Sequence, residues 1–105
     1  MSQQVLSLDL SSAKAKKLIA EIIKDSNKIL FSPHASKRMK QRKITATQVL
    51  CCLKHGHIVE APYRDIKTAD WRLTLETVSA GDIIKVAIAF HKNKMGEVIV
   101  VVTVI

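Results

Sequence analysis

The sequence predicts a single α+β domain in which N-terminal helices pack on one face of a four-stranded antiparallel β-meander. In the first half, apolar residues recur with the helical period of about 3.6 residues. The second half consists of short runs rich in β-branched and aromatic residues, separated by turn-forming residues. Helices followed by consecutive hairpins are typical of α+β domains, and a chain of 105 residues fits one such domain over residues 1–105.

The first predicted helix covers residues 13–26. Its core face is defined by apolar residues at helical spacing, namely Ala15, Leu18, Ile19 and Ile22. Its opposite face carries charge pairs of the kind found on ordinary surface helices, and we assign it no function. The apolar residues 28–31 are interpreted as a link to the next helix.

The second predicted helix begins at Pro33, because the preceding serine can act as N-cap and proline is suited to the first helical position. It is expected to end around Lys43. A third helix follows after a threonine cap and stops at Gly56.

Four strands are expected after this helix, at residues 57–63, 70–78, 83–91 and 97–105. Turn-forming residues at 79–82 and 93–96 should make hairpins of the last three strands.

Alternation along the predicted strands indicates a face directed away from the core. Lys85 and His91 belong to the outward set of one strand, and Arg72 belongs to the polar set of the strand before it. Aligned side by side, these residues would form a basic face suited to a nucleic-acid backbone. The alternative is an ordinary solvent-exposed face.

The stretch SPHASKRMKQRK, residues 32–43, contains the main candidate catalytic side chains. His34, Arg38 and Arg42 stand four residues apart and form one row on a helix. The first-turn position and the nearby Arg38 disfavour a protonated His34 imidazole, which favours a histidine able to act as a base. Guanidinium groups bind phosphate and stabilise developing negative charge, so the row suits phosphodiester cleavage. The alternative is a solvated basic helix face.

The charge balance favours polyanionic partners. Seventeen Lys and Arg against nine Asp and Glu give a formal net charge of +8, which suits RNA, DNA or an acidic protein. The adjacent Cys51 and Cys52 cannot readily meet disulfide geometry within a helix, so we interpret them as free thiols in the cytoplasm. We expect no targeting segment and no membrane-spanning segment.

Cys51, His55 and His57 are candidate metal ligands, because they lie close together in the sequence. A zinc site needs at least three well-placed ligands, and the sequence has neither a C-x-x-C pair nor an H-E-x-x-H motif. We therefore expect no metal and no cofactor.

From Phe31 onward, FSPHASKRMKQRKITATQVLCCLKHGHIVE resembles the H-A-x-x-R-M-x-x-R-x-I-[ST] opening of a domain-of-unknown-function family. The segments WRLTLETVSAGDIIKVAIAF and VIVVVTVI resemble its closing strands. The resemblance covers residues 29–105 and leaves a helix at about residues 11–27 as an addition. That family is grouped with the RelE-like toxins of the barnase, EndoU, colicin and RelE type of nuclease fold.

This resemblance implies a RelE-like fold and a metal-independent endoribonuclease, often the toxin of a toxin-antitoxin pair with a small acidic antitoxin as partner. It carries over His34, Arg38 and Arg42 as catalytic residues and Thr103, more loosely, as a substrate contact. Lys43 is a departure, because the family often has glycine there, and this puts the joint between the second and third helices in question.

The expected reaction is attack of the ribose 2′-hydroxyl on the adjacent phosphate. His34 would act as general base or as an orienting group, and Arg38 and Arg42 would stabilise the phosphorane. Arg72, Lys85 and His91 would hold the strand, with His91 as a candidate acid. One alternative is a non-catalytic module that binds nucleic acid or protein through the same basic helix. Another is an interaction protein whose apolar residues 98–105 pair with a partner strand.

Overall fold

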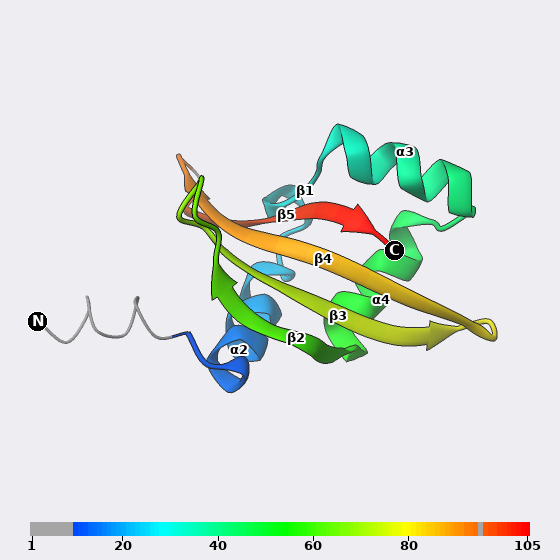
Figure 1. Cartoon of the computed structure of the whole chain (residues 1–105), viewed down its shortest axis with the longest axis horizontal. Coiled ribbons are helices and arrows are strands. Elements are labelled where there is room, and N and C mark those ends of the chain that lie inside the picture. The colour runs from blue at the N-terminus through cyan, green and yellow to red at the C-terminus, as the bar shows by residue number, and fades with distance from the viewer. Residues whose placement is uncertain (1–9, 95) are drawn as a thin grey trace, which may run out of the picture.

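The computed structural model describes residues 10–94 and 96–105 (Figure 1). Its elements follow one another as α2 (Ser12–Ile22), the 3₁₀ turn η1 (Ser26–Lys28), β1 (Ile29–Phe31), α3 (Pro33–Arg42), α4 (Ala46–His55), β2 (His57–Arg64), β3 (Trp71–Ser79), β4 (Asp82–Asn93) and β5 (Gly96–Val104). The α+β class is confirmed. The five strands form one mixed sheet in the order β1-β5-β4-β3-β2.

The meander of β2 to β5 is antiparallel, as the sequence predicts, but a four-stranded sheet is wrong. Residues 29–31, interpreted as part of a link, form β1 and pair in parallel with β5, in the register Ile29↔Ile99 to Phe31↔Val101. Three residues are too few to show a strand period, and the partner strand lies at the other end of the sequence. On one side β5 is paired with β4, and on the other it is paired with β1 over Ile99–Val101, so these three residues are not open to the partner strand of the alternative interpretation.

The helix boundaries follow from local hydrogen bonds. The Ser32 hydroxyl accepts a hydrogen bond from the Ala35 N–H at 2.9 Å, so α3 begins at Pro33 as predicted. A capping box starts α4, in which Thr45 and Gln48 each bond the other's backbone N–H. The first helix, α2, ends at Ile22, earlier than predicted, and the chain then turns through η1 into β1.

The two-residue turn between β3 and β4 matches its prediction. Ser79 pairs with Asp82, and the central residues Ala80 and Gly81 both have positive φ, at 53° and 85°. These signs are those of a type I′ hairpin turn. The turn between β4 and β5 is closed by the pair Asn93↔Gly96, while Met95 lies outside the described residues.

The core lies between the sheet and the helices α2 and α4, which cover the same side of the sheet in Figure 1. Its largest fully buried side chains come from both layers, namely Ile19, Val49, Leu53, Leu73, Leu75, Ile84, Val86, Ile88, Ile99, Val101 and Val104. In contrast, α3 stands beside the C-terminal half of β5, beyond the end of β1. The opposite face of the sheet has no helix over it among the described residues.

None of the described helices is both long enough and apolar enough to cross a membrane. The expectation about a targeting segment concerns residues 1–9, which lie outside the described residues. Cys51 and Cys52 are both free thiols.

Candidate functional site

The basic row of α3 points away from the core, as its spacing predicts. His34 and Arg42 are exposed and Arg38 is half-buried, while Ala35 is buried and Met39 packs against the core. The two sets lie on different sides of the helix because residues four apart stack on one face.

Arg38 contacts the end of the sheet. Its Nε donates a hydrogen bond to the Val104 carbonyl at 3.3 Å. The Ile105 N–H donates to the Lys85 carbonyl of β4 at 2.9 Å, so the Val104 carbonyl, one residue earlier, lies on the side of β5 that faces away from β4. Arg38 therefore supplies a donor to the edge of β5 where β1 has already ended.

Ser32 donates hydrogen bonds to the same edge of β5, at carbonyls that precede Val104 in the chain. Its hydroxyl donates to the Val102 carbonyl at 2.8 Å and its N–H donates to the Val101 carbonyl at 3.0 Å. The start of α3 thus continues the hydrogen bonding that β1 begins.

The structure brings Thr103 and Lys85 to the same end of β5. Thr103 is paired with Ala87 on the open face, and its hydroxyl donates a long 3.5 Å hydrogen bond to the Val104 carbonyl that Arg38 also contacts. Lys85 lies two residues before Ala87 on β4, so its side chain is on the same face of the sheet as that of Ala87. We call Arg38, Lys85 and Thr103, with His34 and Arg42 one helical turn to either side of Arg38, the α3–β5 cluster.

Lys85 forms a long ion pair with Glu76. Its Nζ lies 3.8 Å from Glu76 Oε1, and the two side chains are 45% and 31% exposed. A pair with this much solvent contact is worth at most about 1 kcal/mol, so Lys85 can exchange Glu76 for an anionic ligand at little cost.

The other predicted contacts lie elsewhere on the open face. Arg72 is paired with Ala89 near the middle of the sheet, and its Nε is buried with no hydrogen-bond partner among the described residues. His91 is at the far end of β4, on the order of 20 Å from Lys85 at about 3.3 Å per residue. Its Nδ1 lies 3.5 Å from Asp70 Oδ1. The structure does not bring His91 to the α3–β5 cluster.

The open face also holds a carboxylate that sequence reasoning did not place. Glu60 of β2 is paired with Thr74, whose hydroxyl donates to Glu60 Oε1 at 2.8 Å. Two register shifts in β2 move its residues between faces, so simple alternation could not assign Glu60. Together with Glu76, it makes this face mixed in charge rather than uniformly basic.

The candidate metal ligands Cys51, His55 and His57 do not form a metal-binding cluster. Within residues 10–94 and 96–105, no group of three or more His, Cys, Asp or Glu side chains could hold a metal ion. The nearby Cys52 is buried. Its burial and, to a lesser extent, the neighbouring Cys51 raise the pKa of its thiol to about 11.

An apolar groove of about 560 Å³ lies between α3 and the start of α4. The residues that line it are Phe31, Ser36, Met39, Lys40, Lys43, Ile44, Thr45 and Ala46. Lys43 closes α3 in the left-handed conformation, with φ 56° and ψ 42°. This conformation favours glycine, which accounts for the residue type expected there from the resemblance.

The motif of α3, its link to α4 and the closing strands are thus all present in one fold, and a family model matches residues 31–105. The chain belongs to the family described as Domain of unknown function (DUF4258). The DUF4258 match includes every residue of the α3–β5 cluster and begins after α2. No curated protein and no solved structure matches the chain.

Proposed function

We propose that this DUF4258 protein is a RelE-like, metal-independent endoribonuclease whose site is the α3–β5 cluster. The observation that carries the proposal is the convergence of Arg38 and Thr103 on the Val104 carbonyl, which joins the basic row of α3 to the open face of the sheet. A phosphate bound there would meet guanidinium groups from the helix and a hydroxyl from the strand.

In the proposed reaction, His34 removes the proton of a ribose 2′-hydroxyl, whose oxygen attacks the adjacent phosphorus. The bond to the 5′ oxygen of the next nucleotide breaks, and that oxygen takes a proton from water. The products are a 2′,3′-cyclic phosphate and a 5′-hydroxyl. Arg38 and Arg42 stabilise the charge of the phosphorane, as guanidinium groups aimed at developing charge do in other active sites.

Lys85 is proposed to hold a neighbouring phosphate, and Arg72 a phosphate nearer the middle of the open face. The formal net charge of +8 supports binding of a polyanion over this face. His91 would contact RNA only beyond these positions, because it lies at the other end of β4. It is therefore not proposed as the acid.

The test is cleavage of a single-stranded RNA by the purified protein in EDTA. His34→Ala and Arg42→Ala should each reduce the rate, His34→Ala by roughly 10²-fold or more, as loss of a general base does. Lys17→Ala, which removes one exposed positive charge from α2, is the matched control and should cleave like wild type. Equal cleavage by wild type and His34→Ala would remove the proposed site.

The second candidate is a non-catalytic RNA-binding module. It is favoured by the fact that Arg38 Nε is already engaged by the Val104 carbonyl, which gives this arginine a structural role. Binding that weakens steeply with salt, without cleavage by the wild-type protein, would support this candidate.

We further propose that the enzyme is a toxin and that an acidic antitoxin binds the groove between α3 and α4. The groove offers apolar side chains with Lys40 and Lys43 at its rim, which suits an amphipathic helix with acidic flanks. Expression of the chain alone should then arrest growth, expression of His34→Ala should not, and an adjacent reading frame should encode a small acidic protein. Normal growth during expression of the folded wild-type chain would contradict the toxin assignment.

A further inference from the structure

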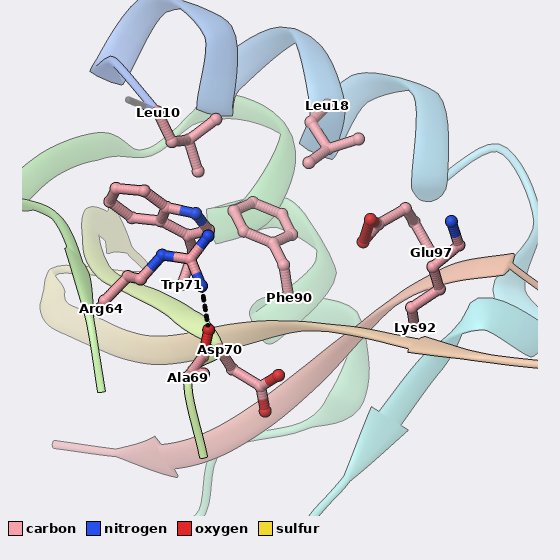
Figure 2. A pocket seen from close by; sticks show the side chains of 9 residues that line it. All are labelled: Leu10, Leu18, Arg64, Ala69, Asp70, Trp71, Phe90, Lys92 and Glu97. Atoms are coloured by element: carbon pink, nitrogen blue, oxygen red, sulfur yellow. Dashed lines mark hydrogen bonds between the residues drawn. The ribbon is translucent and has the colours of Figure 1, made fainter. Parts of the chain in front are cut away.

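One aromatic side chain, Tyr63 of the edge strand β2, lies on the open face of the sheet. The adjacent residue, Arg64, is paired with Trp71 of β3, and both of these side chains lie on the side of the sheet that α2 covers (Figure 2). Successive residues of a strand point to opposite faces. The next pair, Tyr63 and Arg72, therefore lies on the open face, which it shares with the α3–β5 cluster.

The Tyr63 ring is accessible to a ligand. The residue is 42% exposed and does not belong to the hydrophobic core. Within the described residues its side chain forms no hydrogen bond and no contact with another ring or a cation. The neighbouring Arg64 lies over Trp71 instead, with its guanidinium carbon 5.1 Å from the ring centre. An accessible aromatic ring on a sheet surface can stack on the base of a nucleic acid.

Tyr63 and Arg72 line a hollow of about 550 Å³ together with residues 65–68 of the loop between β2 and β3. This volume falls within the range of about 300–1,000 Å³ for small-molecule sites. Ile66 of the loop lines the same hollow and is 98% exposed. Covering an apolar side chain that lies in water is favourable, so a flat ring on Tyr63 would gain from contact with Ile66 as well.

Hydrogen bonds hold the loop that forms the wall of this hollow. The Asp65 carboxylate accepts hydrogen bonds from the Thr68 N–H and hydroxyl, both at 3.0 Å. Arg64 Nη1 donates to the Ala69 carbonyl at 2.8 Å, the bond drawn in Figure 2. The N–H and hydroxyl of Thr68 and, to a lesser extent, the charge of Arg72 lower the pKa of Asp65. The carboxylate beside Arg72 is therefore already engaged by Thr68.

The guanidinium of Arg72 has no hydrogen-bond acceptor in the described part of the chain. Its Nε is buried without a partner, and the side chain forms no hydrogen bond or ion pair among the described residues. A buried donor without an acceptor is unfavourable. A phosphate in the hollow would supply an acceptor, and guanidinium groups bind phosphate through two parallel hydrogen bonds.

The hollow is too far from the α3–β5 cluster for one nucleotide to contact both. Thr103 is paired with Ala87, and Arg72 is paired with Ala89, two residues farther along β4. Strand spacings of about 4.8 Å and a rise of about 3.3 Å per residue place Tyr63 roughly 16 Å from Thr103. The two alanines between these sites are small, so an RNA backbone can lie close to the sheet there.

Two carboxylates also lie on the open face. Glu60 accepts a hydrogen bond from the Thr74 hydroxyl at 2.8 Å, and Glu76 Oε1 lies 3.8 Å from Lys85 Nζ. Both therefore have a partner on the sheet, and neither lines the hollow. These carboxylates disfavour phosphates beside them and leave Arg72 as the favourable phosphate position in the middle of the face.

We propose that Tyr63 and Arg72 form a second subsite for single-stranded RNA, in which Tyr63 stacks on a base and Arg72 binds the adjoining phosphate. Residues paired across two antiparallel strands have Cβ atoms about 5 Å apart, so one nucleotide can contact both. The bases of a duplex are already paired and stacked, so this subsite selects single strands. The inference rests on the proposed function, because RNA is the ligand of both sites, but it requires binding alone.

Fluorescence anisotropy of a labelled, 2′-O-methylated RNA of about 12 nucleotides measures binding without cleavage. Tyr63→Ala should weaken binding about 5- to 150-fold, the typical loss for one stacked base. Tyr63→Phe, which keeps the ring, should bind within twofold of wild type. The same RNA in a duplex should bind equally to wild type and Tyr63→Ala. Circular dichroism shows whether each variant is folded.

The salt dependence of binding separates the role of Arg72 from that of Tyr63. Arg72→Gln should reduce the slope of log affinity against log salt concentration by about 0.7, the change for one phosphate contact on a single strand. Tyr63→Ala should leave this slope unchanged, because tyrosine is uncharged. Lys17→Gln, an equal loss of charge on the exposed side of α2, is the control and should keep the wild-type affinity and slope.

Replacing one nucleotide at a time by an abasic one locates the stacked base. At one position, removal of the base should weaken binding by wild type but not by Tyr63→Ala. The proposal would be overturned by equal binding of wild type and Tyr63→Ala, by the lack of such a position, or by an unchanged slope in Arg72→Gln, even if RNA is cleaved at the α3–β5 cluster. Binding that depends on Tyr63 without any cleavage would support it and contradict only the proposed endoribonuclease activity.

Discussion

The C-terminal end of α3 provides the sharpest test of the fold, through replacement of Lys43 by glycine. Lys43 adopts φ 56° and ψ 42°, and this conformation lets its own N–H bond the Lys40 carbonyl while the Ile44 N–H bonds the Met39 carbonyl at 2.9 Å. The helix end therefore depends on a left-handed residue. In lysine, the Cβ atom makes that conformation unfavourable.

The magnitude follows from two opposing effects. The left-handed conformation costs an L-residue roughly 1–2 kcal/mol, which glycine does not incur. Glycine loses about 0.5–1 kcal/mol more than alanine in conformational entropy on folding. The difference predicts that Lys43→Gly raises the free energy of unfolding by roughly 0.5–1 kcal/mol. For a domain of this size, that corresponds to a rise in Tm of about 2–6 °C.

The measurement is thermal and urea unfolding of wild type, Lys43→Gly and Lys43→Ala, followed by circular dichroism. Lys43→Ala is the control, because it removes the charged side chain but retains the Cβ atom. It should give no comparable gain. A Lys43→Gly protein no more stable than wild type, or an equal gain in Lys43→Ala, would refute the assignment of strain to this backbone conformation.

Three further substitutions or modifications have defined outcomes. Gly56→Ala should lower the free energy of unfolding by about 1–3 kcal/mol in urea denaturation, because an added Cβ would overlap the Cys52 carbonyl oxygen and lie 3.0 Å from another backbone oxygen. Ala80→Asn should raise Tm, because asparagine tolerates the positive φ at the first central position of the type I′ turn better than alanine does; an unchanged Tm would count against this assignment. Iodoacetamide at pH 8 should modify Cys51 and leave the Cys52 thiol unmodified in the native protein, because burial keeps the pKa of Cys52 near 11. Peptide mass spectrometry measures the modification of each cysteine, and equal modification of the two would contradict this expectation. Because that pKa lies above the 9.0 of an unburied thiol, the stability contributed by Cys52 is complete below pH 9 and is lost as the pH rises toward 11.

The sequence predicted the structure correctly where the conformation of a segment depends on residues close to it in the chain. Ser32 and Pro33 fix the start of α3, and the Ala80-Gly81 pair fixes a two-residue hairpin turn. Alternation along β4 correctly separates its buried residues from Lys85 on the open face. In each case the decisive interaction joins residues a few positions apart.

Contacts between segments far apart in the sequence could not be predicted from such local signals. Strand β1 exists because the last strand of the chain offers it a hydrogen-bonding edge, and three residues carry no recognisable period. The bulges of β2 place Glu60 on the open face, although nothing in its spacing shows where pairing shifts. The separation of His91 from Lys85, by contrast, follows from strand geometry alone and was available from the sequence.

The position of the candidate site depends on how the edge of β5 is covered. After β1 ends, the outer carbonyls of β5 need donors, and Ser32 and Arg38 supply them. The same contacts hold α3 against the outer edge of β5, so removal of Arg38 would alter the sheet edge as well as any phosphate site. The side chains of His34 and Arg42 are exposed and form no hydrogen bond or ion pair within the described part of the chain. Their substitutions therefore separate chemistry from folding, which substitution of Arg38 cannot do.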